Sequence, residues 1–250
     1  MPPSPEPSAA IPPGNPEAVR ELFDRIAPEY DRLNDLLSLG LHRFWKRQAV
    51  AWLQPVPGQR LLDLCCGTGD LALLLAEKVR PAGFVLGLDA AAAPLVQAQR
   101  RASRCPWLPL EFRQADAQAT ELADGWADGA VMAYGLRNLA DPAAGLQELR
   151  RLLRPGGRAA VLDFNRALDP QGKTAQFQRF YLRQLVVPLA KRAGLEAQYA
   201  YLEDSLARFP TGPQQEQLAR DAGFSQAQHC LLYTSPSPRD LSTSRMPSSA

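Results

Sequence analysis

A short glycine turn carries the first chemistry that can be read from this sequence. Gly67, Thr68 and Gly69 follow an apolar run, and Asp63 stands just before them in the chain. Glycines at a turn between a strand and a helix let the backbone approach a bound nucleotide closely. Asp89 follows Gly69 by 20 residues, at the end of the next apolar run. This spacing fits two cofactors, a dinucleotide such as NAD and S-adenosylmethionine.

The charges around the turn discriminate between these two cofactors. Asp63 is expected at the end of a buried strand, and Asp70 directly follows the turn. Carboxylates at a helix N-terminus oppose a pyrophosphate, because like charges ~6 Å apart repel by roughly 3 kcal/mol at an effective dielectric constant of about 20. The same carboxylates attract the ammonium and sulfonium groups of S-adenosylmethionine. The turn therefore favours S-adenosylmethionine, and an NAD-dependent oxidoreductase is the alternative.

These residues lie in a segment where apolar runs alternate with helical patterns. Such alternation is typical of βαβ units and of a parallel sheet covered on both faces. Right-handed crossovers then give an α/β, doubly wound, Rossmann-like sheet, in which ligands bind at the carboxyl ends of the strands. We expect strands at residues 60–66, 84–90, 108–117, 128–136 and 154–164, with 224–232 as a candidate sixth strand.

The remaining segments divide the chain into one domain and two tails. Residues 1–14 are rich in proline and are expected to be a disordered arm, and residues 15–232 form the domain. A helical cap precedes the sheet, and residues 166–210 form a helical insertion after the fifth strand. The aromatic residues of this insertion either line a channel for an isoprenoid tail or form ordinary core. Residues 233–250 are expected to be disordered. They resemble foreign translated sequence, with a natural tail as the alternative, so the final strand hairpin of the sheet is expected to be incomplete.

Composition narrows the partners and the compartment. The chain has 250 residues and a net charge of +2, with no basic stripe interleaved with aromatic residues, so nucleic acid is not favoured as a partner. No run is apolar enough to span a bilayer, and the start has no signal-peptide pattern. The four cysteines have no metal-ligand spacing, and Cys65-Cys66 is read as the end of a buried strand. We expect a cytoplasmic protein without a metal.

The pattern D63-x-x-x-G67-x-G69 resembles motif I of the class I S-adenosylmethionine-dependent methyltransferases. The resemblance implies that the glycine turn, with Thr68, holds the cofactor and that Asp89 binds both ribose hydroxyls. It further implies that the adenine meets the residues after the third strand and that the fourth strand contributes Ala133. The adenine contacts fall at Asp116 and Ala117.

Three longer stretches resemble the ubiquinone/menaquinone biosynthesis C-methyltransferases. They are YDRLNDLLSLGLHRFWK from Tyr30, YGLRN from Tyr134 and RLLRPGGRAAVLDFN from Arg151. The last ends in Asp163-Phe-Asn165 where the family usually has Glu-x-Ser, which resembles the branch that acts on 2-phytyl-1,4-naphthoquinone. The resemblance implies methyl transfer to a ring carbon of a prenylated naphthoquinol; a demethylmenaquinol or ubiquinone precursor is the alternative. A lipid substrate would bring the protein into transient contact with a membrane surface.

Four residues are candidates for catalysis. Arg137 and Asn138 follow the fourth strand, where Arg137 would stabilise an oxyanion and Asn138 would orient the ring. An ion pair with a helix carboxylate is the alternative for Arg137. Tyr30 and His42 are secondary candidates in the cap; His42 is either a general base or a histidine packed beside Phe44 or Trp45. A third possibility for the whole chain is a nonenzymatic protein that only binds S-adenosylmethionine.

Overall fold

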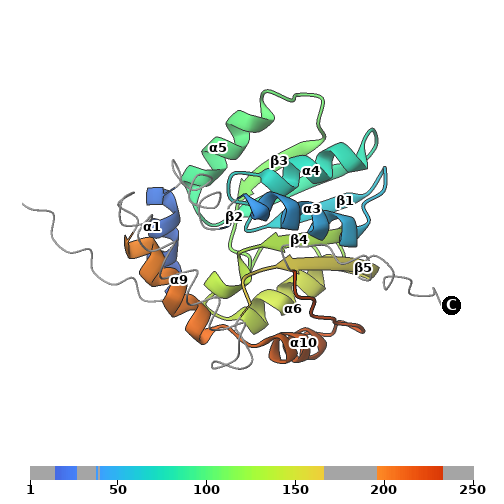
Figure 1. Cartoon of the computed structure of the whole chain (residues 1–250). Helices are drawn as coiled ribbons and strands as arrows, with labels where there is room; N and C mark the ends of the chain where they lie inside the picture. The colour runs from blue at the N-terminus through green and yellow to red at the C-terminus, as the bar shows by residue number, and fades with distance from the viewer. Residues whose placement is uncertain (1–14, 27–37, 39, 166–195, 233–250) are drawn as a thin grey trace, which may run out of the picture.

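The computed structural model describes residues 15–26, 38, 40–165 and 196–232. Tyr30, most of the insertion and both tails lie outside these residues, so the expectations for them stay predictions. The described residues form a parallel sheet of five strands in the order β3-β2-β1-β4-β5 (Figure 1). The strands are β1 (Arg60–Leu64), β2 (Phe84–Asp89), β3 (Leu110–Gln114), β4 (Ala127–Ala133) and β5 (Leu153–Leu162). The expected doubly wound parallel sheet is confirmed.

Helices pack on both faces of this sheet (Figure 1). One cluster of core residues lies between one face of the sheet and helices α3 and α4. A second cluster lies between the opposite face and helices α6 and α10. Two further helices, α1 and α9, contact α5 and the turn after β4, respectively. The helices are α1 (Pro16–Ile26), α3 (Leu41–Leu53), α4 (Asp70–Val79), α5 (Ala92–Ala102), α6 (Pro142–Leu152), α9 (Glu196–Arg208) and α10 (Gly212–Asp221).

The central strands are buried on both faces, as the continuous apolar runs predict. Leu61, Leu62 and Leu64 of β1 are each fully buried. Alternate residues of a strand point to opposite faces, so these leucines enter both core clusters. The first strand ends at Leu64 rather than at the cysteines, because Cys65 adopts a left-handed φ of 57° that breaks the extended backbone.

The structure shortens the expected fourth strand and, within the described residues 224–232, does not contain the candidate sixth strand. The fourth strand ends at Ala133, and Leu136–Asn138 form a 3₁₀ turn, η1. The segment 224–232 contains no strand. It turns back toward α10, where the backbone N–H of His229 donates to the Glu216 side chain at 2.7 Å. This contact gives the segment a partner other than β5. None of the described helices combines the length and apolarity that crossing a bilayer requires.

Candidate active site

A cavity opens at the carboxyl ends of four strands and is covered by α1. The loops after β1, β2, β3 and β4 all reach it, and α1 adds four side chains. Ligands of open parallel sheets bind at this edge, close to where the strand order reverses. The lining consists of Pro16, Val19, Arg20, Phe23, Cys65, Gly67, Asp89–Ala91, Pro94, Ala115–Gln118, Ala133–Gly135 and Asn138–Ala140.

Asp89 is a half-buried carboxylate in the wall of this cavity. Its Oδ2 accepts the backbone N–H of Gly67 at 2.8 Å, and its Oδ1 accepts that of Ala91 at 2.9 Å. One side chain thereby ties the glycine turn to the loop after β2. Burial raises the pKa of Asp89. A carboxylate has about four acceptor positions, so two remain for donors such as ribose hydroxyls.

The other two carboxylates near the turn do not line the cavity. Asp63 is 1% exposed and lies beneath the turn, where its Oδ2 accepts the backbone N–H of Ala72 at 2.8 Å. Asp70 forms ion pairs with Lys46 at 2.8 Å and with Arg101 at 2.6 Å. The two carboxylates used in the charge argument therefore lie outside the cavity lining, whereas Asp89 and Asp116 belong to it.

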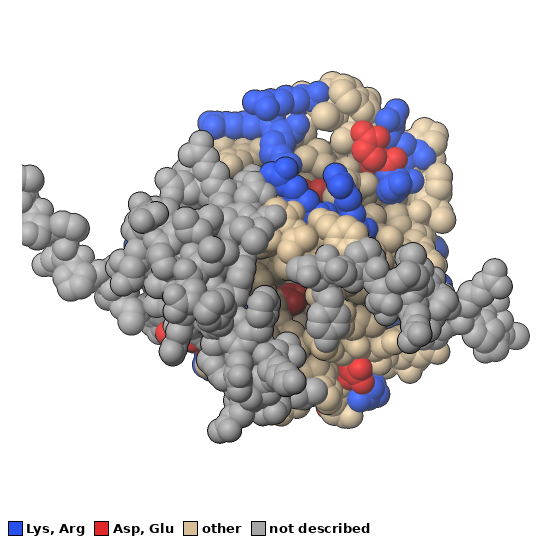
Figure 2. All heavy atoms as spheres, in the orientation of Figure 1, with Lys and Arg blue, Asp and Glu red and all other residues tan. Residues whose placement is uncertain are grey.

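Two cations neutralise Asp70, and the face of the molecule that carries α3 is also basic. Figure 2 shows lysine and arginine side chains gathered in front of the sheet, over the face that carries α3. Although burial raises the pKa of Asp70, the ion pairs with Lys46 and Arg101 lower it to about 2. Arg101 also donates to the Thr68 carbonyl at 3.0 Å, which fixes the middle of the glycine turn from behind.

The structure brings five of the eight expected cofactor residues to the cavity. Thr68 and Gly69 belong to the turn itself and Asp63 lies beneath it, and none of the three lines the cavity. The sequence analysis did not identify the lining residues of α1, because an amphipathic pattern shows that a helix packs but not against what. The five expected residues in the lining are Gly67, Asp89, Asp116, Ala117 and Ala133.

Arg137 and Asn138 follow β4 in η1 but face different surroundings. The Arg137 guanidinium pairs with Asp163 at 2.5 Å, and the two side chains are 9% and 3% exposed. It also lies 5.2 Å from the ring centroid of Phe164. Asn138 lines the cavity, whereas Arg137 lies behind it. Arg137 therefore forms an ion pair, but with Asp163 directly after β5 and not with the helix carboxylate that the alternative named.

His42 lies away from the cavity. It is 3% exposed on α3, and its Nδ1 is 2.9 Å from the Ser38 Oγ. The Ser38 Oγ also accepts the backbone N–H of His42 at 3.1 Å. A buried histidine with a hydroxyl partner agrees with a role in packing, as the alternative interpretation held. Tyr30 lies outside the described residues.

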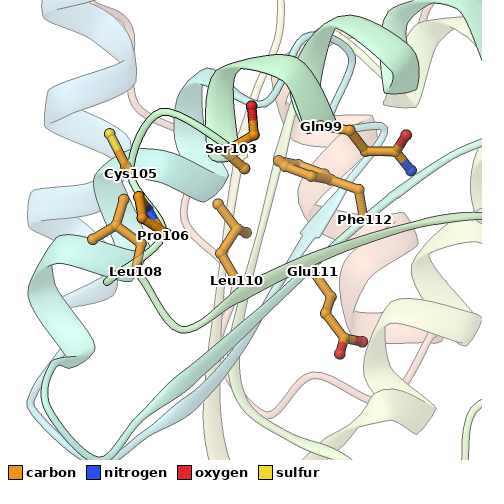
Figure 3. A pocket seen from close by; sticks show the side chains of 9 residues that line it. Gln99, Ser103, Cys105, Pro106, Leu108, Leu110, Glu111 and Phe112 are labelled. Carbon is orange, nitrogen blue, oxygen red and sulfur yellow. The ribbon is translucent and has the colours of Figure 1, made fainter.

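A second hollow, of about 370 Å³, lies between the end of α5 and β3 (Figure 3). Loop residues such as Cys105 and Leu108, together with Leu110 at the first position of β3, form part of its wall. It therefore lies at the amino end of β3, away from the edge that binds ligands in such sheets. The Phe112 ring, which projects toward α5, separates this hollow from the glycine turn (Figure 3).

Asp63 makes a specific prediction for the pH dependence of stability. Burial raises its pKa from 3.8 to about 8, so the folded chain binds this proton more tightly than the unfolded chain does. The Asp63 contribution to stability is therefore largest below pH 4 and is lost as the pH rises to about 8. We expect Asp63→Asn to stabilise the free protein at pH 8 by up to about 5 kcal/mol, at about 1.36 kcal/mol per pKa unit.

Urea unfolding of both proteins at pH 5, 7 and 9 measures this effect. Asp221→Asn, at the exposed end of α10, is the matched control and should leave the pH profile unchanged. The same slope with pH in the wild-type protein and in Asp63→Asn would contradict the assignment.

Comparison with known proteins agrees with this geometry. Residues 14–234 match the model of the ubiE/COQ5 methyltransferase family. A 2-phytyl-1,4-naphthoquinone methyltransferase of Thermosynechococcus vestitus is 50% identical, over 86% of this chain and 93% of the relative. The relative of the same name in Trichormus variabilis is 48% identical, over 84% and 92%. A chloroplastic 2-phytyl-1,4-beta-naphthoquinone methyltransferase of Arabidopsis thaliana is 45% identical, over 84% and 81%.

Solved structures show the same fold at low sequence identity. A SAM dependent methyltransferase of Aquifex aeolicus has a TM-score of 0.53 and 17% identity, with 84% of this chain and 88% of the other covered. A possible histamine N-methyltransferase of Thermotoga maritima has a TM-score of 0.55 and 22% identity, with 82% and 81% covered. These likenesses concern the fold alone.

Proposed function

The chain belongs to the ubiE/COQ5 methyltransferase family, and we propose that it transfers the methyl group of S-adenosylmethionine to a ring carbon of 2-phytyl-1,4-naphthoquinol. The assignment of this substrate rests on the 50% identity to a 2-phytyl-1,4-naphthoquinone methyltransferase over 86% of the chain. Demethylmenaquinol or a ubiquinone precursor is the alternative acceptor, since the family model covers the wider group.

The cavity supports S-adenosylmethionine as the donor. Asp89 keeps acceptor positions for ribose hydroxyls, and the loop at Asp116 and Ala117 lies on the same cavity wall for the adenine. Gly67 lets the backbone approach the ligand between them. An acidic residue at the end of β2 suits the ribose of either cofactor, so the family match, rather than Asp89, favours S-adenosylmethionine over NAD.

The reaction places few demands on the protein. The sulfonium supplies a methyl group that needs no further activation, so the chain must align the acceptor carbon with it and favour loss of the ring hydroxyl proton. A carbon–methyl bond forms and the methyl–sulfur bond breaks; the ring carbon then loses its proton and the ring oxygen regains one, so that one proton is released overall. Asn138 lines the cavity, and in this proposal it orients the ring. Arg137 stays protonated and is paired with Asp163, so it holds η1 and contributes electrostatically from behind.

The phytyl chain of the proposed substrate also suggests where in the cell the protein works. The phytyl chain partitions into bilayers, so we propose a cytoplasmic protein that contacts a membrane surface transiently to collect its acceptor. No nucleic acid enters this proposal.

Two measurements test the function. Calorimetry should show that S-adenosylmethionine binds and that NADH does not compete with it. Donor labelled in the methyl group, incubated with chemically reduced 2-phytyl-1,4-naphthoquinone, should give labelled phylloquinol. NADH bound at the glycine turn, with no binding of S-adenosylmethionine, would overturn the donor. Donor binding without transfer to any quinol would leave a protein that only binds S-adenosylmethionine. Faster transfer to a demethylmenaquinol would shift the acceptor to the alternative.

A further inference from the structure

The backbone carbonyl of Tyr134 links the two candidate catalytic residues. Asn138 Nδ2 donates to this oxygen at 2.8 Å, and Arg137 Nη1 donates to it at 3.1 Å. Tyr134 has a left-handed φ of 59°, which turns the chain sharply at the end of β4. Both side chains thus take their position from one oxygen at the cavity wall.

A second contact completes the orientation of the Asn138 amide. The Tyr201 hydroxyl donates to Asn138 Oδ1 at 3.0 Å. With a donor on its oxygen and an acceptor on its nitrogen, the amide has one favourable orientation, because the reversed group would set its oxygen against the Tyr134 carbonyl. One N–H and one lone pair of Asn138 then remain for a ligand in the cavity.

Tyr201 reaches this position from a distant part of the chain. It lies on α9, 63 residues after Asn138, and is 5% exposed. Burial raises the pKa of Tyr201, so its hydroxyl stays protonated and remains a donor at neutral pH. Of the α9 residues whose side chains are described, Ser205 is also buried, but its hydroxyl donates to the Leu202 carbonyl of the same helix.

We propose that Tyr201 is a positioning residue for methyl transfer, which holds the Asn138 amide in the one orientation that presents a donor and an acceptor to the ring of the quinol. This inference rests on the proposed function. It makes α9 part of the acceptor site through a single hydroxyl. Tyr201 need not touch the substrate for this role.

The test compares Tyr201→Phe with Ser205→Ala. Each removes one buried hydroxyl from α9, but only the first removes a contact to the cavity wall. We expect Tyr201→Phe to lower kcat roughly tenfold to a hundredfold through misplacement of Asn138, with the KM for S-adenosylmethionine unchanged. Ser205→Ala should keep kcat within about twofold of wild type, since the hydrogen bond that its hydroxyl makes among the described residues stays within α9.

A double variant separates positioning from packing. Tyr201→Phe combined with Asn138→Ala should lose no more turnover than Asn138→Ala alone, because residues that act as a unit are not additive. Losses that multiply, or a Tyr201→Phe kcat equal to that of Ser205→Ala, would overturn the inference.

A spectroscopic measurement keeps the test independent of the acceptor. The side-chain NH₂ resonances of Asn138, assigned by their loss in Asn138→Ala, should shift in Tyr201→Phe and stay in place in Ser205→Ala. If the wild-type protein methylates no quinol, the proposed function fails, and unshifted Asn138 resonances in Tyr201→Phe would still overturn the positioning role.

Discussion

Replacement of Arg137 by alanine is expected to abolish methyl transfer and to lower the free energy of unfolding by about 3–5 kcal/mol. The change leaves the Asp163 carboxylate, which is 3% exposed, without its ion-pair partner. It also removes a donor from the Tyr134 carbonyl and therefore loosens the turn that carries Asn138. Urea unfolding and single-turnover methyl transfer measure the two losses separately.

An exposed ion pair provides the matched control. Arg80 pairs with Glu77 at 3.4 Å, with side chains 43% and 52% exposed, so Arg80→Ala should cost less than about 1 kcal/mol and leave turnover unchanged. The double variant Arg137→Ala/Asp163→Ala should recover part of the stability, because no buried charge is left alone, but not the activity. Wild-type turnover in Arg137→Ala would remove this residue from the mechanism.

Gly69→Ala is expected to unfold the glycine turn and to abolish cofactor binding. A Cβ at this position would lie 2.6 Å from the Phe112 Cζ and 3.2 Å from the Ala98 Cβ. Figure 3 shows that the Phe112 ring projects toward α5 and borders the second hollow, so the ring must move into that space for the Cβ to fit. The backbone φ of 83° adds a left-handed penalty of roughly 1–2 kcal/mol for alanine.

Gly58→Ala separates the two costs. Gly58 has a φ of 88°, yet a Cβ there would meet nothing within 4 Å. It should therefore show the backbone penalty alone, and the difference between the two variants in urea unfolding reports the clash. Calorimetry with S-adenosylmethionine should show normal binding for Gly58→Ala and none for Gly69→Ala. Equal stability of the two variants would contradict the close packing against Phe112.

The sheet and the outline of the site were predictable because they depend on local patterns. Apolar runs separated by helical periodicity indicate parallel strands, and residues directly after such strands gather at one edge. Gly67, Asp89 and Asn138 were identified in this way, and all three line the cavity. The family resemblance further named the donor and the acceptor class.

The remaining features depend on tertiary contacts that sequence spacing does not encode. Asp63 and Asp70 look equivalent beside the turn, but Lys46 and Arg101 neutralise one of them, and Ala72 binds the other beneath the turn. The cover that α1 provides and the Tyr201 contact bring together segments far apart in the chain. The amphipathic pattern of a helix predicts which of its residues are buried, but not which side chain each of them contacts.

The two hydrogen bonds that the Asp89 carboxylate accepts from backbone N–H groups also affect what a ligand meets when it enters the cavity. Because Gly67 and Ala91 are held by the same carboxylate, the loops after β1 and β2 are already arranged before anything binds. Little ordering entropy is then left for the ligand to supply from these loops. The helix that covers the cavity is anchored in the same way, since the Asp24 side chain of α1 accepts the backbone N–H of Ala93 at the start of α5. The binding site is thus largely preorganised by carboxylates that accept backbone N–H groups of neighbouring loops.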